Sequence, residues 1–409
     1  MKRVIYLFLV FSIFLISCND SKIVDPPAKQ NEITIGVLVS LTGNWSSLGI
    51  TTKSALEIAV DEINQNYMEN DINLKFVLKV IDTKLDPELA YSATQELITD
   101  GVEIIIGPQS SAELSKIKPL LDANNIFAVS MSSTASSLAL AGDHILRICP
   151  DDKPEGVAIS ALMWSKGIKK VIAVYRDDDG NIGLKRSMTK SFINLGGTVI
   201  DSIKYSNDDN ITANLIDEIV TSLNTSTNAS ETAIYLAGFD EITDIFTIAK
   251  SNTQLSSTLW FGSNGSAMSS AIVSNADAAS FANEVEFCTP LFALSAENET
   301  EWNSLFTAIE QATELKPDAY TFAAYDAIKI ASLAYESSDN GFTNLFSNYV
   351  TISTTYNGLT GLTEFNSAGD RKFGNFTFFE ICGINPNFSW VSVGSYNTST
   401  NQLLYTGCN

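Results

Sequence analysis

Serine and threonine clusters follow two predicted strands, at the points where parallel sheets bind ligands. Ser110 and Ser111 follow the strand at 102–106, and Ser-Met-Ser-Ser-Thr at 130–134 ends the next strand. Each loop leads into a helix, whose first N–H groups lack partners and carry partial positive charge. With the hydroxyls, they could bind a carboxylate; the alternative is simple helix capping. The candidates in this half are Ser111, Ser132, Ser133 and Thr134.

A second group of loops offers acceptors. They read Arg-Asp-Asp-Asp-Gly at 176–180, Gly-Phe-Asp at 238–240 and Gly-Ser-Asn-Gly at 262–265. Because one group donates and the other accepts, a zwitterion held between two lobes would satisfy both. The alternative for the acids at 177–179 is a solvated turn, which we expect for Asp179. The candidates in this half are Asp177, Asp178, Gly180, Phe239, Asp240 and Asn264.

The residue inventory argues against catalysis. His144 is the only histidine, which excludes a Ser-His-Asp triad, a Cys-His pair and a two-histidine metal site. There is no phosphate-binding lysine motif and no dinucleotide fingerprint, and no cysteine pair has metal-site spacing. We expect no cofactor and no metal. A hydrolase using paired acids is the alternative, but no base or nucleophile stands out.

Buried strands alternate with amphipathic helices and would position these loops. ITIGVLVS at 33–40 is a nearly continuous apolar run, typical of a strand buried on both faces. The helix predicted at 51–64 has apolar residues at helical period. The pattern starts again at 154, which predicts two Rossmann-like, doubly wound parallel-sheet lobes. From 361 onward we expect short antiparallel strands.

The N-terminus reads as an export signal. Lys2 and Arg3 precede an apolar run at 4–16 that is too short to span a membrane. Leu-Ile-Ser-Cys at 15–18 resembles a bacterial lipobox, which predicts a lipid anchor on Cys18; the alternative is an ordinary signal with an incidental cysteine. We therefore expect a signal at 1–18, a flexible tether at 19–31, and a domain held outside a membrane.

The net charge limits the binding partners that we expect, and the cysteine content limits the possible disulfides. The net charge of −22 and pI near 4.3 argue against nucleic acid and against docking on anionic lipid. Besides Cys18, four cysteines allow three pairings, and the sequence does not choose among them. Cys382 and Cys408 could form a disulfide near the chain end in an oxidising compartment, or they could be buried thiols. The four are Cys149, Cys288, Cys382 and Cys408.

Seven segments, in order and spacing, resemble the type I periplasmic binding proteins of ABC importers, specifically the leucine/isoleucine/valine-binding group. The resemblance covers nearly the whole chain after the signal. The segments are IGVLVSLTG at 35–43, ALEIAVDEIN at 55–64, the Asp82/Asp86-Pro87 segment, IIGPQSSAE at 105–113, VSMSSTASSL at 129–138, AAYDA at 323–327 and LTEFNSAGDR at 362–371.

The resemblance implies two lobes that are joined by three crossings and close on a ligand. We expect the crossings near Cys149, at 288–290 and at 359–361. The lobes implied are lobe 1 at 32–149 and 290–358, and lobe 2 at 150–289 and 359–409.

The resemblance also implies roles for single residues. Ser111 resembles the carboxylate-binding serine, Ser132 a residue that offers backbone atoms, and Thr134 one that binds by backbone and hydroxyl. Trp45 and Leu48 lie in the loop that lines the side-chain pocket.

The second lobe departs from the family. Phe239 stands where an aromatic ring often lies beside the ligand ammonium, but Asn264 stands where branched-chain binders carry an acid for that ammonium. A neutral amide binds an ammonium more weakly than a carboxylate does. Either another acid supplies the charge, or the ligand is not a plain α-amino acid. The alternative acids are Asp177, Asp178 and Asp240.

Two further departures concern the pocket rim. Around Gly180 the aromatic residue that often closes the pocket is absent, and Leu85 and Ser110 stand where some relatives have a disulfide. We expect a lipid-anchored solute-binding protein that captures an amino acid or related small carboxylate and delivers it to an ABC permease. The alternative is a receptor component that senses a ligand with the same fold.

Overall fold

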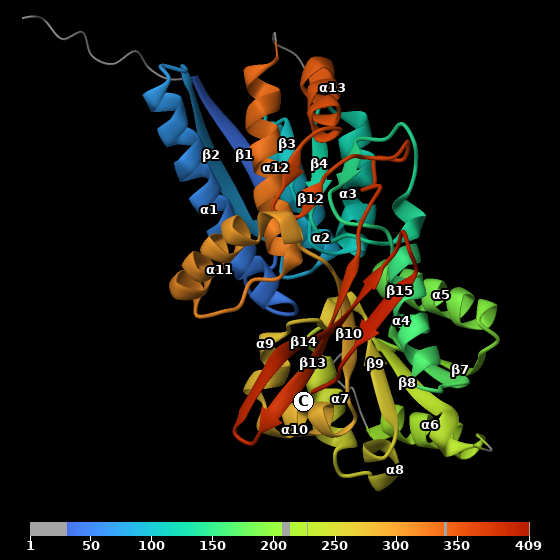
Figure 1. Ribbon diagram of the computed structural model, residues 1–409. Helices are drawn as coiled ribbons and strands as arrows, with labels where there is room; N and C mark the ends of the chain where they lie inside the picture. The colour runs from blue at the N-terminus through green and yellow to red at the C-terminus, as the bar shows by residue number, and fades with distance from the viewer. Residues whose placement is uncertain (1–30, 207–212, 227, 339–341, 409) are drawn as a thin grey trace, which may run out of the picture.

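The computed structural model describes residues 31–206, 213–226, 228–338 and 342–408 (Figure 1). The predicted signal, Cys18 and all of the predicted tether except residue 31 lie outside these ranges. Within the described residues, no helix combines the length and the apolar character that a membrane span requires.

The first lobe is built on a five-stranded parallel sheet of order β2-β1-β3-β4-β5. Side chains alternate across it: Val37 and Val39 join the core under α1 and α12, whereas Leu38 joins the core under α2 and α3. The strands are β1 Asn31–Val39, β2 Leu74–Asp82, β3 Ile104–Ile106, β4 Phe127–Ser130 and β5 Ile145–Arg147. The covering helices are α1 Ser46–Glu69, α2 Pro87–Thr99, α3 Ser111–Ala123 and α12 Ala319–Glu336.

The second lobe is built on an eight-stranded sheet of order β15-β14-β13-β10-β9-β8-β6-β7. Strands β6 to β10 pair in parallel, and β13, β14 and β15 extend the sheet with antiparallel pairs. The predicted terminal strands are therefore present, but β13 and β14 are 9 and 11 residues long. The strands are β6 Lys170–Arg176, β7 Thr198–Tyr205, β8 Thr232–Ala237, β9 Leu259–Gly262, β10 Cys288–Phe292, β13 Phe376–Ile384, β14 Asn387–Asn397 and β15 Gln402–Tyr405.

Helices also cover both faces of the second sheet. Val171 and Ala173 share a core with α4 and α5, while Ile172 and Val174 share one with α6, α7 and α10. One parallel sheet and one sheet that is parallel from β6 to β10, each covered by helices on both faces, confirm the predicted pair of α/β lobes. The helices of this lobe are α4 Asp152–Ser165, α5 Asp179–Asn194, α6 Ala213–Asn224, α7 Ile242–Ala249, α8 Thr253–Ser256, α9 Ser270–Ser274 and α10 Ala276–Glu284. The remaining elements are α11 Glu299–Thr313, α13 Phe342–Ser353, β11 Asn357–Gly358 and β12 Gly361–Leu362.

The chain passes between the sheets three times, at the waist visible in Figure 1. Strand β10 belongs to the second sheet as far as Phe292, two residues beyond the predicted crossing at 288–290. Asp370 forms a parallel β-bridge with Arg147 of β5, so the chain lies beside the first sheet again at residue 370. Arg371 then donates to the Ile148 carbonyl at 3.1 Å, which ties two crossings together. The lobe boundaries themselves stay a prediction.

Candidate functional site

The loops at the carboxyl ends of both sheets meet between the lobes. In lobe 1 they follow β1, β3 and β4, and in lobe 2 they follow β6, β8 and β9. The Asn264 amide lies 3.5 Å from the Thr134 hydroxyl, and the Trp45 N–H donates to Asp240 at 2.6 Å. Thr134 and Trp45 from the first half of the sequence therefore face Asn264 and Asp240 from the second half across one interface.

The lobe 1 hydroxyls are largely engaged within their own lobe. Ser132 donates to the Gln109 carbonyl at 2.8 Å, and Ser133 lies 3.5 Å from the same oxygen. The Ser111 hydroxyl accepts from the Ala135 N–H at 3.1 Å. These contacts hold the two loops against each other and direct the Ser132 and Ser133 hydroxyls within lobe 1. Thr134 differs, because its hydroxyl points across to the other lobe.

Helix capping accounts for part of the serine cluster. Ser110 is the N-cap of α3, and its hydroxyl accepts from the Glu113 N–H while the Glu113 carboxylate accepts from the Ser110 N–H. The capping alternative is therefore correct for Ser110. Ser111 is the first residue of the helix and lies in the interface: a Cβ on Gly180 would sit 3.6 Å from its hydroxyl.

Trp45 joins the two lobes through its backbone and its indole ring. It has a left-handed backbone with φ 58°, so α1 begins at Ser46, earlier than the predicted 51. Its indole lies 4.8 Å from the Phe239 ring and 6.1 Å from the Tyr320 ring. Trp45 and Leu48 are each 2% exposed. Both predicted pocket-loop residues are thus buried, and Tyr320 is an aromatic contact that the sequence prediction missed.

The three acids proposed to supply charge already have donors. Asp240 accepts from the Trp45 N–H and from the Ser269 hydroxyl, both at 2.6 Å. Asp178 caps α5 and pairs with Arg176 at 3.0 Å, whereas Asp177 is largely exposed and pairs with Lys204 at 2.8 Å. Burial raises the pKa of Asp240 and of Asp178, although the donors offset part of that effect.

Glu155, in the first turn of α4, is the acid closest to Asn264. It accepts from the Asn264 N–H at 3.0 Å and from the Asn264 side-chain amide. Asp152 lies one turn earlier, and its N–H donates to the Thr134 carbonyl at 2.9 Å. Burial raises the pKa of Asp152 to about 7, and burial together with the Asp152 charge raises that of Glu155 well above its ordinary value.

The prediction missed both acids for a local reason. Acidic residues are common in the first turn of a helix, where they complement the helix dipole. Asp152 and Glu155 therefore look like routine terminus residues in the sequence. The available signal was that both follow the predicted crossing near Cys149, where the chain enters the second lobe.

Two cavities of about 380 Å³ each flank the interface. The polar one lies beside Phe239 and also contains Leu85 and Ser110, the positions where some relatives have a disulfide. The apolar one lies between the start of α12 and strands β10, β13 and β14. Its larger apolar lining residues are Met268, Leu291, Phe292, Leu294, Trp302, Phe306 and Phe379, and the acids Asp318 and Glu299 also line it.

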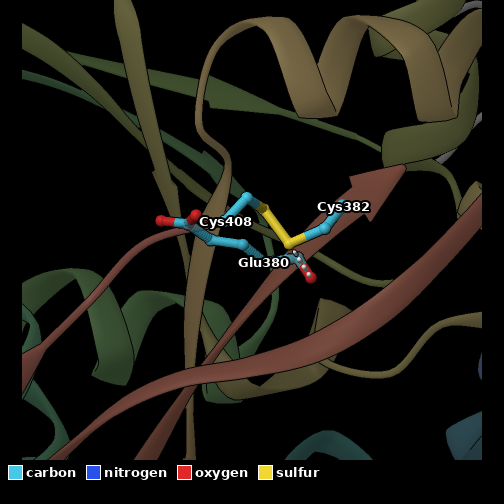
Figure 2. A group of neighbouring side chains, drawn as sticks. All are labelled: Glu380, Cys382 and Cys408. Atoms are coloured by element: carbon cyan, nitrogen blue, oxygen red, sulfur yellow. Dashed lines mark hydrogen bonds between the residues drawn. A yellow bond between two sulfur atoms is a disulfide. The ribbon is translucent and has the colours of Figure 1, made fainter. Parts of the chain in front are cut away.

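A disulfide between Cys382 and Cys408 links strand β13 to the segment that follows β15. Figure 2 shows it beside Glu380. Of the alternatives that the sequence left open, this pairing is the one present, and Cys149 and Cys288 are buried free thiols. With both sulfurs in the disulfide, no thiolate is left in the group of Glu380, Cys382 and Cys408. That group therefore does not fit a metal ion in the oxidised protein.

Comparison with known proteins identifies the family. An uncharacterised protein of Methanocaldococcus jannaschii is 26% identical over 97% of this chain and 97% of its own length. Leu/Ile/Val-binding protein BraC3 of Rhizobium johnstonii is 30% identical to this chain over a shorter match. That match covers 42% of this chain and 46% of BraC3.

Among solved structures, the leucine-binding protein LivK of Thermotoga maritima superposes with a TM-score of 0.73 at 18% identity. The match covers 90% of this chain and 99% of that one. The fold is therefore that of the type I periplasmic binding proteins, as the sequence predicted. The model of the receptor family ligand binding region matches residues 51–382. The chain belongs to that family of ligand-binding regions.

Proposed function

We propose that the chain is an extracytoplasmic solute-binding protein that captures a small ligand between its lobes. The observation that carries this proposal is the convergence of polar groups from both sheets on one buried interface. Thr134 and Asn264 lie 3.5 Å apart there, although 130 residues separate them in the chain. Ligand sites of open α/β sheets lie at such strand ends.

Capture would be passive. An open form holds the ligand on the loops of one lobe, and closure adds contacts from the other. A ligand that binds the closed form better shifts the population toward it. No bond is made or broken, and we infer no turnover.

The ligand that we propose is an amino acid or a related small carboxylate, and the receiver is an ABC permease. The names of BraC3 and LivK support this assignment by family. We further propose that Cys18, in Leu-Ile-Ser-Cys, carries lipid and tethers the domain outside the membrane.

A thermal-shift screen over amino acids, small carboxylates, amides and peptides tests capture. A ligand at about 100 times its Kd stabilises the protein by about 2.7 kcal/mol. Ser111→Ala and Thr134→Ala should abolish that shift, whereas Ser92→Ala, an exposed serine of α2 bonded within its own helix, should keep it. A shift that survives both site variants would show that the pocket lies elsewhere.

A receptor component is the second candidate, and the family description itself favours it. The two functions differ in the event that closure triggers. Uptake of labelled ligand into vesicles carrying the neighbouring permease and ATPase supports transport. Binding without such uptake, together with ligand-dependent association with a membrane signalling protein, supports sensing.

A further inference from the structure

Two carboxyl groups in the first turn of α4 are buried at the interface between the lobes. Asp152 has no exposed surface, and Glu155 is 2% exposed. Because they stand three residues apart on one helix, they lie on the same face. Both belong to the segment that enters lobe 2 after the first crossing. Their partners come from lobe 1 through Thr134 and from lobe 2 through Asn264.

The surroundings of Asp152 leave part of its carboxyl without a partner. One oxygen, Oδ2, accepts from the Ser136 N–H at 3.2 Å, and the Thr134 hydroxyl also contributes a hydrogen bond. The other oxygen, Oδ1, is buried with no hydrogen-bond partner. Arg147 is the charged group that favours the ionised form, and Asp151 opposes it.

Arg147 is itself committed elsewhere. Its guanidinium pairs with Asp370 at 2.5 Å and donates to the carbonyls of Ser133 and Ala135. Arg147 therefore favours the ionised form of Asp152 only through its charge, without a direct ion pair.

Glu155 has donors but no cation. Both of its oxygens accept from Asn264. Its electrostatic interactions are with Asp152, Tyr235 and Tyr320, none of which is a cation. Within the described residues, no lysine or arginine forms an ion pair with it. By contrast, Asp178 has Arg176 and Asp177 has Lys204.

Burying ionised carboxyls without a cation is costly, so such groups take up a proton or a positive partner. Here the two carboxyls stand among polar groups from both lobes. A protonated nitrogen on the ligand would fill the missing role, and it would reach the pair only between the lobes.

We propose that Glu155, oriented by Asn264 and backed by Asp152, binds a protonated nitrogen of the captured ligand. The proposal rests on the capture function above and deepens it, because it places the positive end of the ligand on α4. It also replaces the predicted suppliers of charge, Asp177, Asp178 and Asp240. Asn264 then acts as a positioning residue for Glu155.

The test uses ligand triplets on the wild-type protein. Each amino acid is compared with the carboxylic acid that lacks its amino group and with the amine that lacks its carboxyl; leucine, 4-methylpentanoate and 3-methylbutylamine form one triplet. We expect every stabilising amino acid to bind at least tenfold more tightly than its deaminated partner, since a hydrogen bond to a charged group is worth about 1.5–3 kcal/mol.

A variant series isolates the residue. Glu155→Gln removes the charge and keeps the shape, and should weaken binding at least tenfold. Glu380→Gln makes the same change at a buried glutamate of β13 that accepts from the Tyr405 hydroxyl within lobe 2, and it should leave binding unchanged. Unliganded melting curves show whether each variant folds. If Glu155→Gln does not fold, Asn264→Ala takes its place: it removes the side-chain donor that orients Glu155 and should reduce the preference for the amino acid over its deaminated partner.

Two failures can be told apart. Deaminated ligands that bind as tightly as the amino acids, or a Glu155→Gln protein with unchanged affinity, would overturn this subsite and leave capture standing. An absence of any stabilising compound would instead count against capture itself, and with it against the subsite.

Discussion

At the scale of residues, a buried ion pair holds two distant segments of the chain together. Arg147 and Asp370 pair within the protein at 0% and 2% side-chain exposure and join β5 to the segment that leads to the last crossing. A buried pair adds little net stability, yet either partner left alone is strongly destabilising. Such residues therefore matter more for which strands stay together than for the total stability.

Asp370→Asn should lower the free energy of unfolding by about 3–5 kcal/mol, because it leaves the Arg147 guanidinium buried without its counter-charge. Urea denaturation measures the loss. Glu364→Gln, which removes a partly exposed pair with Lys372, is the control and should cost less than about 1 kcal/mol. Equal effects of the two changes would contradict the assigned role of the buried pair.

Asp152→Asn should alter the pH dependence of stability. The pKa of Asp152 is raised to about 7 in the folded protein, against about 3.9 in an unfolded chain. Because the folded state keeps this proton to a higher pH than the unfolded chain does, protonated Asp152 stabilises the folded protein fully below about pH 4. That stabilisation is lost as pH rises toward 7. The asparagine variant has no such proton, so its stability does not fall for this reason.

The free energy of unfolding of the variant relative to wild type should therefore rise between pH 4 and 7. For an isolated group the rise is about 4 kcal/mol at most. Denaturation curves of both proteins at several pH values give this difference, in which unrelated carboxyls cancel. A constant difference across the window would show that the Asp152 pKa is not raised.

At the scale of elements, close packing of α4 against α5 sets the position of the acidic first turn of α4. The backbones approach at Gly156, directly after Glu155, where a Cβ would lie 2.5 Å from the Ser187 carbonyl carbon. Ser160 also donates to the Met188 carbonyl at 3.2 Å. The small residue at 156 thus fixes the distance between the two helices and, with it, the position of the acidic turn.

Gly156→Ala should destabilise the protein by about 1–3 kcal/mol, because the added methyl overlaps the α5 backbone, even though alanine favours helices by about 1 kcal/mol. Urea denaturation without ligand measures it. Gly180→Ala is the matched control in α5, since its Cβ would meet its nearest atom at 3.4 Å, an ordinary contact. A stabilised Gly156→Ala protein would mean that the helices can separate at little cost.

Contacts between the lobes set the state of the whole molecule. The Trp45 N–H donates to Asp240, the Asn44 amide donates to Glu241 at 3.2 Å, and the Trp45 indole packs on Phe239. All three join the loop after β1 to the loop after β8. These few contacts favour a closed arrangement of lobes that are otherwise joined by three crossings.

Asp240→Ala should shift the unliganded protein toward open forms, because it removes the acceptor of the Trp45 N–H. The radius of gyration from X-ray scattering should rise, and the ligand Kd should rise about tenfold as the competent state becomes rarer. Asp244→Ala changes an exposed acid of α7 and should alter neither quantity. An unchanged scattering profile for Asp240→Ala would mean that this contact does not control closure.

The sequence alone determined the class of the molecule. Apolar runs such as 33–40 and helical periods such as 51–64 report burial on a local scale, because a strand covered on both faces and an amphipathic helix each have their own spacing. The strand ends followed from that pattern, and so did the two groups of candidate residues. Helix starts were less well predicted, as at Trp45, whose left-handed backbone leaves no mark in the pattern.

Only the tertiary structure decided which polar groups meet. Glu155 and Asn264 are 109 residues apart, and their contact depends on how α4 packs after the first crossing. The place of residue 370 beside β5 likewise depends on a bridge between residues 147 and 370. Periodicity carries no information on such distant pairs, because it reports only which residues within one strand or helix are buried.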